Sequence, residues 1–480
     1  MPPGTRGIGR WVIGLALLLV LGVAGWLLLG GDEKRDDDRE AAPKPARTLA
    51  ELQPDRIIRR VEELRGLKLK RRPKFRLITP AQAKRYAGAK AARESGDVSE
   101  HEQRVSTSLT KLLGLLPADT DLDELSDRLA GDAFLGFYDG EKNTIFIVRR
   151  DGKLPVAVET TVAHELVHAI DDQHHGIFRR MRRISKSDDG DRLTAYLSVL
   201  EGNASAVDQE YAKRYRVPTA DPGEERRAQE LLKEVPFGVL LQISFPYVFG
   251  EAFMGAISHG PGGKERREEV LGADAPRTTG EILDPGRYPG GGPRKADPGE
   301  APDTSEAPDT SEAPDTRGGP DDPDTGARDA GAGPDEADAG ARDGGVGARS
   351  AQDAVPRVRV DARPVLGGRW RVRDADTFGA ADVLVLLSPA EKDSLTASLV
   401  ARAWRDGRYQ YLRRRSEGRQ GCNDPCVGRD ACVGTIRWAG GDDAQRFAKA
   451  FGDTITEHRD AQGADGTADD ARVWRVAGGG

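Results

Sequence analysis

Cysteine is scarce in this chain, and its scarcity excludes two classes of protein. Only three cysteines occur in 480 residues, Cys422, Cys426 and Cys432. A small fold stapled by a disulfide framework is therefore excluded. No cysteine lies near the N-terminus to carry a lipid, which argues against a lipoprotein. Outside the cytoplasm we expect one disulfide and one odd thiol, and the sequence leaves the pairing open.

An excess of positive charge is also absent. Lysine and arginine number 72 against 79 aspartates and glutamates, for a net charge of -7. The arginines are interspersed with acidic residues rather than gathered into one basic face. Because nucleic-acid binding needs such a face, we expect no nucleic-acid partner.

Residues 289–354 lack the side chains that build a core. From 289 to 350 there is no aromatic residue, and Val346 is the only large aliphatic one. The sequence Glu-Ala-Pro-Asp-Thr-Ser occurs twice in succession from Glu300, followed by a truncated third copy. Such a segment buries too little apolar area to offset its ordering entropy, so we expect a disordered linker. A role in binding cations or a cell-wall partner is the alternative to a plain spacer.

One long uncharged apolar run is present near the N-terminus, at residues 11–30. Its length matches a bilayer core of about 30 Å. Arg6 and Arg10 precede it and acidic residues follow it, so residues 1–10 are predicted to be cytoplasmic. We expect a single-pass anchor in the cytoplasmic membrane, with the bulk of the chain periplasmic or extracellular. A cleaved signal peptide is the alternative, although its apolar region would be about 7–15 residues long and end in a small-x-small site.

Histidine is scarce as well, yet four of the seven lie within twelve residues. His164, Glu165 and His168 have the form His-Glu-x-x-His. Two histidines four apart on a helix project about 40° from each other, so both imidazoles can reach one cation. Zinc is the expected metal, and Glu165 is placed to act as general base on a zinc-activated water. The other interpretation is a buried helix whose histidines only hydrogen-bond to neighbours, but it leaves the desolvated Glu165 without a purpose.

A catalytic zinc usually has three protein ligands, and the third is not given by the motif. His174 has the spacing of the long metzincin motif, but Asp171 stands where that motif has a helix-breaking glycine. An unbroken helix would carry His174 away from the metal. Asp171 or Asp172 could be a ligand, although a hydrogen bond from Asp171 to a ligand histidine is its better interpretation. Glu201 is the preferred third ligand.

Glu201 lies in a second predicted helix, residues 193–204. Apolar residues recur at helical spacing along it, and Glu201 borders their face. A carboxylate in that position needs a partner, and zinc is a suitable one. Gly202 and Ala204 are small enough to let this helix approach the first one closely.

These two segments resemble the gluzincin metallopeptidases, of which thermolysin is the familiar member. A closer resemblance is to a group of poorly characterised bacterial zinc-metallopeptidase-like proteins, and it extends to residues 245–250, 278–288, 376–379 and 404–409. The resemblance implies zinc bound by His164, His168 and Glu201, with Glu165 as base. It implies no particular substrate. The separation of His168 and Glu201 is longer than in thermolysin, so thermolysin's substrate pockets cannot be transferred.

Stabilisation of an oxyanion in this clan generally needs an extra tyrosine or histidine donor. Tyr211, Tyr247 and His259 are the downstream candidates. Tyr247 is preferred because Pro246 and a nearby glycine would hold its loop, although a purely structural role is the alternative for each.

A predicted β-hairpin at residues 134–148 precedes the His-Glu-x-x-His motif. Its second strand is a candidate for the edge strand that pairs with extended substrate.

The remaining pattern favours an α+β fold. Upstream it predicts helices near 52–64, 80–94 and 105–116 and a strand at 74–78. Beyond the linker it predicts strands at 370–373, 409–412, 435–438 and 473–476, helices at 380–387 and 394–404, a turn at Asp406-Gly407, and a helix carrying Phe447. We interpret residues 31–48 as a tether, 49–288 as a zincin-like metallopeptidase domain, and 355–480 as a companion α+β lobe. Separate binding domains are the alternative.

The sequence thus predicts a membrane-anchored zinc metallopeptidase of the bacterial envelope, acting on peptide or protein substrates. A catalytically inactive envelope binding or scaffold protein that keeps the zinc fold is the alternative. A structural protein without zinc is a third.

Overall fold

The computed structural model describes residues 46, 48–86, 100–117, 120, 125, 135–150, 152–187, 189–219, 226, 229–230, 233–260, 262–288, 357–388, 394–414 and 429–461. The predicted anchor at 11–30, the tether up to residue 45, the linker at 289–354 and the strand at 473–476 lie outside this part of the chain. Within it, helices and two small sheets are mixed, which confirms the α+β class.

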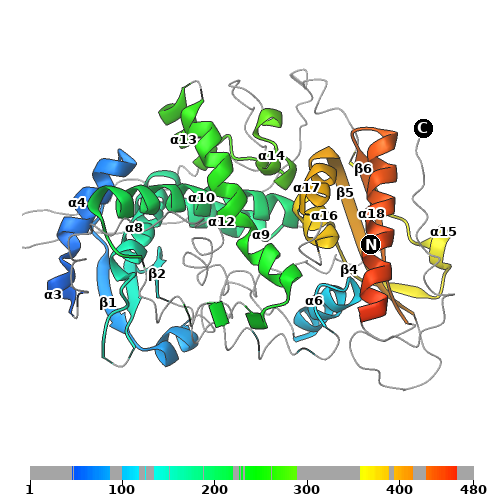
Figure 1. The fold of residues 1–480 in the computed structure, drawn as a ribbon, viewed down its shortest axis with the longest axis horizontal. Helices are drawn as coiled ribbons and strands as arrows, with labels where there is room; N and C mark the ends of the chain where they lie inside the picture. The colour runs from blue at the N-terminus through cyan, green and yellow to red at the C-terminus, as the bar shows by residue number, and fades with distance from the viewer. Residues whose placement is uncertain are drawn as a thin grey trace, which may run out of the picture. The chain divides into compact units, whose positions relative to one another are not determined.

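The first sheet has three strands, β1 (Lys74–Ile78), β2 (Gly136–Asp139) and β3 (Thr144–Val148), in the order β1-β3-β2. Figure 1 labels β1 and β2 of this sheet. β2 and β3 form the predicted antiparallel hairpin, and β1 pairs with β3 in parallel. The prediction that β3 is the substrate-pairing edge strand is therefore wrong, because β3 is hydrogen-bonded on both sides. The edge next to the candidate site is β2.

Three long helices form the central part of the fold: α8 (Val158–His175), α10 (Gly190–Tyr215) and α12 (Phe237–His259). α8 continues unbroken through Asp171 and is capped by Gly176, whose φ of +61° favours glycine. α10 begins at Asp189, whose side chain accepts a hydrogen bond from the backbone N–H of Arg192. Apolar side chains of α8 and α10 share one buried cluster that includes Ala204.

α10 contacts α12 through glycines. A Cβ on Gly202 would lie 2.1 Å from the carbonyl carbon of Gly250, and a Cβ on Gly250 would lie 2.0 Å from the oxygen of Ser198. Gly202 therefore permits the approach of α12, not of α8 as predicted, whereas Ala204 does pack in the cluster shared with α8. Among the described residues α12 is the one helix long and apolar enough to cross a bilayer, but 61% of its apolar window is buried, as in a core helix.

The same part of the chain contains shorter helices: α3 (Leu49–Leu52), α4 (Pro54–Arg65), α6 (Glu100–Leu112), α9 (Ile177–Ser185), α13 (Gly263–Leu271), α14 (Thr279–Leu283) and the 3-10 turn η1 (Pro285–Arg287). The predicted start at Thr79 is confirmed, because its hydroxyl accepts from the N–H of Gln82 and residues 80–86 are helical. α6 begins before the predicted residue 105.

The C-terminal part contains α15 (Arg363–Leu366), β4 (Trp370–Thr377), α16 (Ala380–Leu387), α17 (Ser394–Ala403), β5 (Trp404–Arg414), β6 (Asp430–Trp438) and α18 (Gly441–Ala461). The three strands form an antiparallel sheet in sequence order. Both predicted helices before β5 are confirmed. The predicted turn at Asp406-Gly407 is wrong, because β5 runs through it with only an irregular register near Trp404. Cys432 lies on β6, and the other two cysteines are outside the described residues.

The C-terminal part contacts the first turn of α10. The backbone N–H of Gly190 donates to Asp376, at 3.0 Å, and that of Asp191 donates to the hydroxyl of Thr377, at 2.9 Å. The hydroxyl of Thr279 donates to Asp191 and accepts from the N–H of Ala381. The bonds from Gly190, Asp191 and Ala381 satisfy N–H groups that the start of a helix leaves without an intrahelical partner.

Candidate metal site

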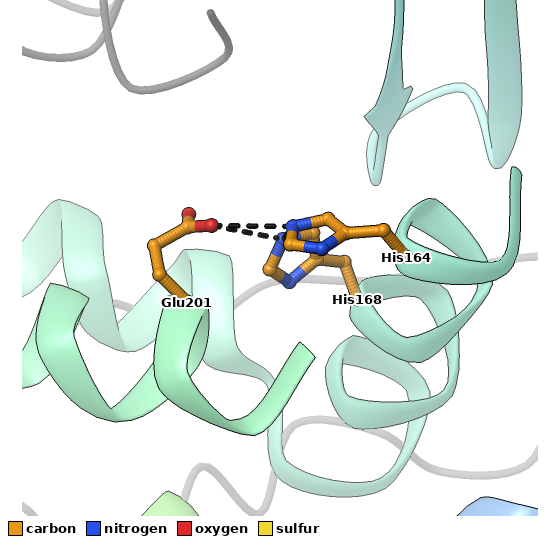
Figure 2. Close-up of side chains that lie close together, drawn as sticks. All are labelled: His164, His168 and Glu201. Atoms are coloured by element: carbon orange, nitrogen blue, oxygen red, sulfur yellow. Dashed lines mark hydrogen bonds and ion pairs between the residues drawn. The ribbon is translucent and has the colours of Figure 1, made fainter. Parts of the chain in front are cut away.

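His164 and His168 of α8 meet Glu201 of α10, as Figure 2 shows. Glu201 Oε2 lies 3.3 Å from His164 Nε2 and 3.6 Å from His168 Nε2. The two Nε2 atoms are 3.1 Å apart, and all three residues are buried. Four donors placed tetrahedrally around an ion at bond lengths of about 2.0–2.1 Å would be separated by roughly 3.3 Å. The group could therefore hold a metal ion with little movement.

The buried cluster balances positive and negative charge. Burial opposes ionisation of Glu201, but His168 and His164 lower the pKa of Glu201 to about 2. Burial likewise disfavours charged imidazoles, yet Asp208 and Glu201 raise the pKa of His164 and Glu201 raises that of His168. The site thus favours bound positive charge, and a metal ion would compete with protons for the two imidazoles.

Asp208 orients the first histidine. Its Oδ2 lies 2.7 Å from His164 Nδ1, which leaves Nε2 of that ring directed at Glu201. Carboxylates commonly hold ligand histidines in this way. By contrast, the buried Nδ1 of His168 has no hydrogen-bond partner among the described residues. The sequence interpretation missed Asp208, although it lies seven residues after Glu201 and so returns to nearly the same face of α10.

The role predicted for Asp171 is wrong. Its carboxylate accepts from Arg65 Nε at 2.8 Å and from Asn203 Nδ2 at 2.6 Å, not from a ligand histidine. Asp172 is not part of the His-His-Glu group either. It accepts a hydrogen bond from the backbone N–H of Phe178. His174 lies near the carbonyl oxygen of Lys68. Its predicted exclusion from the metal group is consistent with the unbroken α8.

Glu165 is buried beside this group on the same helix. Its Oε2 accepts a hydrogen bond from the backbone N–H of Tyr138, at 2.7 Å. Burial raises the pKa of Glu165, while the two histidines oppose that shift. A carboxylate whose pKa is raised towards neutrality is better suited to take and return a proton. Tyr138 belongs to β2, so the hairpin contacts the site through its first strand.

Tyr247 lies close to the same carboxylates. It is buried, and its pKa is raised well above the ordinary value by burial, by the charges of Glu201 and Glu165 and by a hydrogen bond to Glu201. The predicted loop is wrong, because Tyr247 and Pro246 lie inside α12. Of the other candidates, the Tyr211 hydroxyl donates to Glu159 and His259 Nδ1 lies 2.8 Å from the oxygen of Gly255. Of the three, Tyr247 is the one with these contacts to Glu201 and Glu165.

Comparison with known protein families, with curated proteins and with solved structures gave no match. The geometry of the His164, His168 and Glu201 group is therefore the basis for assigning a function.

Proposed function

We propose that this protein is a zinc-dependent metallopeptidase that hydrolyses peptide bonds. The observation that carries the proposal is the buried meeting of His164, His168 and Glu201, with Glu165 beside them. Two imidazole nitrogens and one carboxylate oxygen form a donor set that suits zinc in a catalytic site. A bound zinc ion would supply a Lewis acid that lowers the pKa of a water molecule to about 7.

Each neighbouring residue has a role in this proposal. Glu165 takes a proton from the attacking water and returns it to the leaving amine. Tyr247, whose hydroxyl is hydrogen-bonded to Glu201 in this structure, would instead donate that bond to the developing oxyanion when substrate is bound. An extended substrate laid along the edge of β2 would have to replace Glu165 as the acceptor of the Tyr138 N–H, which donates to Glu165 in this structure. Asp208 holds the His164 ring in place.

The test compares metal content and peptide cleavage in three proteins. The unsubstituted protein should bind one zinc ion and cleave denatured casein or a peptide library. Glu165→Gln should retain zinc and lose cleavage by at least about 100-fold, because general base catalysis contributes that much. Glu201→Ala should lose zinc. Cleavage that survives Glu165→Gln would disprove the mechanism.

The same experiment distinguishes the alternatives. Stoichiometric zinc without turnover of any substrate would indicate a non-catalytic envelope binding or scaffold protein. Absence of zinc from the purified protein would indicate a purely structural role for the buried histidines.

We propose further that residues 11–30 anchor the protein in the cytoplasmic membrane with the candidate metal site outside, which fractionation and protease accessibility of intact cells would test.

A further inference from the structure

A chain of buried and half-buried polar contacts links α4, α8, α10 and α13. Asp171 accepts from Arg65 at 2.8 Å and from Asn203 Nδ2 at 2.6 Å. Asn203 Oδ1 in turn accepts from Arg267 Nε at 2.5 Å. The side chains of Arg65 and Asp171 are both 0% exposed. The carboxamide of Asn203 is held with its donor towards an anion and its acceptor towards a cation, so its orientation is determined by its neighbours.

Arg65 has a second acidic partner besides Asp171. Its two terminal nitrogens donate to the two carboxylate oxygens of Glu268 on α13, one of them at 2.8 Å, and Glu268 also contacts His175 at 2.8 Å. Burial lowers the pKa of Arg65, but Asp171 and Glu268 raise it above its ordinary value. The guanidinium therefore stays charged, and the contact between Asp171 and Asn203 is anchored to two further helices.

The position of Asn203 on α10 means that its bond to Asp171 can fix the rotation of that helix. Asn203 and Glu201 are two residues apart, so their side chains leave the helix in roughly opposite directions, about 200° apart. Between those directions Ala204 packs in the apolar cluster shared with α8. A bond at Asn203 therefore opposes rotation of α10 about its own axis. Such a rotation would move the Glu201 carboxylate away from the two histidines, whose nitrogens lie only 3.3 Å and 3.6 Å from it.

We propose that Asp171 and Asn203 are positioning residues, which set the rotation of α10 against α8 and thereby hold Glu201 at bonding distance from His164 and His168. The inference rests on the metal site proposed above, but it concerns residues outside the ligand set. It predicts that the bond between Asp171 and Asn203 controls metal affinity, not only the stability of the fold.

The test exchanges the two side chains. Asp171→Asn places two amide donors against each other, and Asn203→Asp places two carboxylates against each other. The double variant can keep every hydrogen bond, because the amide now at position 171 would donate to the carboxylate now at position 203. Arg65 would then donate to the amide oxygen, and Arg267 would donate to the carboxylate. Net charge is unchanged in the double variant, since it has one carboxylate and one amide, with their positions exchanged.

The measurement is competitive titration of Zn²⁺ against a chelator, with thermal unfolding of the metal-free proteins alongside. Each single variant should bind Zn²⁺ roughly 10-fold more weakly or worse, as changes around ligand residues do, and the double variant should recover most of that loss. Tyr409→Phe is the matched control, because it removes a buried hydrogen bond to Asp374, at 2.8 Å, in the C-terminal part. It should reduce thermal stability and leave Zn²⁺ affinity unchanged.

The outcomes separate the two proposals. Single variants that lose thermal stability but bind Zn²⁺ like the unsubstituted protein would overturn the positioning role alone. So would a folded double variant whose affinity stays as low as that of the singles. An unsubstituted protein that binds no Zn²⁺ would overturn both proposals. If a charged single variant does not fold, Asn203→Ser removes both amide bonds without adding a charge, and it should show the same loss of affinity.

Discussion

At the scale of single residues, Asp208 is the most informative side chain outside the ligand set. Its carboxylate lies 2.7 Å from His164 Nδ1. Replacing Asp208 by alanine should lower zinc affinity by about 10–100-fold, because His164 loses the acceptor that orients its ring. Competitive zinc titration measures the change. Glu210→Ala, an exposed change two residues further along α10, is the control and should leave zinc affinity unchanged; an equal loss in both variants would contradict the prediction.

Glu268 should make the free energy of unfolding depend on pH in the acid range. Burial raises its pKa, but the bonds from Arg65 and His175 lower it to about 2. A carboxyl whose pKa is lower in the folded than in the unfolded state stabilises the protein above the unfolded pKa of about 4.3, and this contribution is lost as pH falls towards the folded pKa. Glu268→Gln should therefore lose less thermal stability than the unsubstituted protein between about pH 5 and pH 2. Parallel Tm curves for the two proteins would refute this.

The site residues that the sequence predicts best are those recognisable from the pattern within a single helix. The His-Glu-x-x-His motif lies within one helix, and Glu201 is recognisable from the apolar face that it borders. Asp171 could not be placed correctly, because its partner Arg65 is 106 positions earlier in the chain. Nothing in the pattern around either residue encodes that pairing. Asp208 could have been found, since a seven-residue spacing on a predicted helix returns to the face of Glu201.

At the scale of elements, the close contact between α10 and α12 helps to determine the position of Glu201. Gly202→Ala or Gly250→Ala would put a Cβ about 2 Å from backbone atoms of the opposite helix. The helices must then separate, which should lower stability by about 1–3 kcal/mol and weaken zinc binding as Glu201 moves. Gly255→Ala on α12 is the control, because its Cβ would meet nothing within 4 Å. That change should stabilise by about 0.5–1 kcal/mol, and unfolding curves with zinc titrations test all three variants.

The predicted loop at Tyr247 and the predicted edge strand were both wrong, for physical reasons. Pro246 and Gly250 indicated a loop around Tyr247, yet both lie in α12, where the glycine permits the close approach of α10 and the proline is accommodated inside the helix. The hairpin was recognised from its own residues, but which strand lies at the edge depends on β1, which pairs with β3 from a position about 70 residues earlier. Parallel pairing across that distance has no local signal in either strand.

At the scale of the whole molecule, residues on both sides of 289–356 meet at the start of α10. Asp376 and Thr377 accept from the N–H groups of Gly190 and Asp191. Asp191 is buried, and burial raises its pKa well above the ordinary value, while Thr279 donates two hydrogen bonds to it. The helix that carries Glu201 therefore begins against the C-terminal part. This arrangement favours the interpretation of that part as a companion of the peptidase-like unit.

Cutting the chain between 295 and 356 tests this interpretation. A specific protease site inserted there should give two fragments that stay together in gel filtration and unfold in one transition, because the bonds at the start of α10 do not depend on the connection.

Asp376→Ala removes the acceptor for the backbone N–H of Gly190. In the intact chain the connection keeps the two partners close to each other, so the substitution should lower Tm only modestly. After cleavage that connection is lost, and the substituted fragments should separate on dilution while the unsubstituted pair remains together. Unsubstituted fragments that separate at once would instead indicate two independent domains.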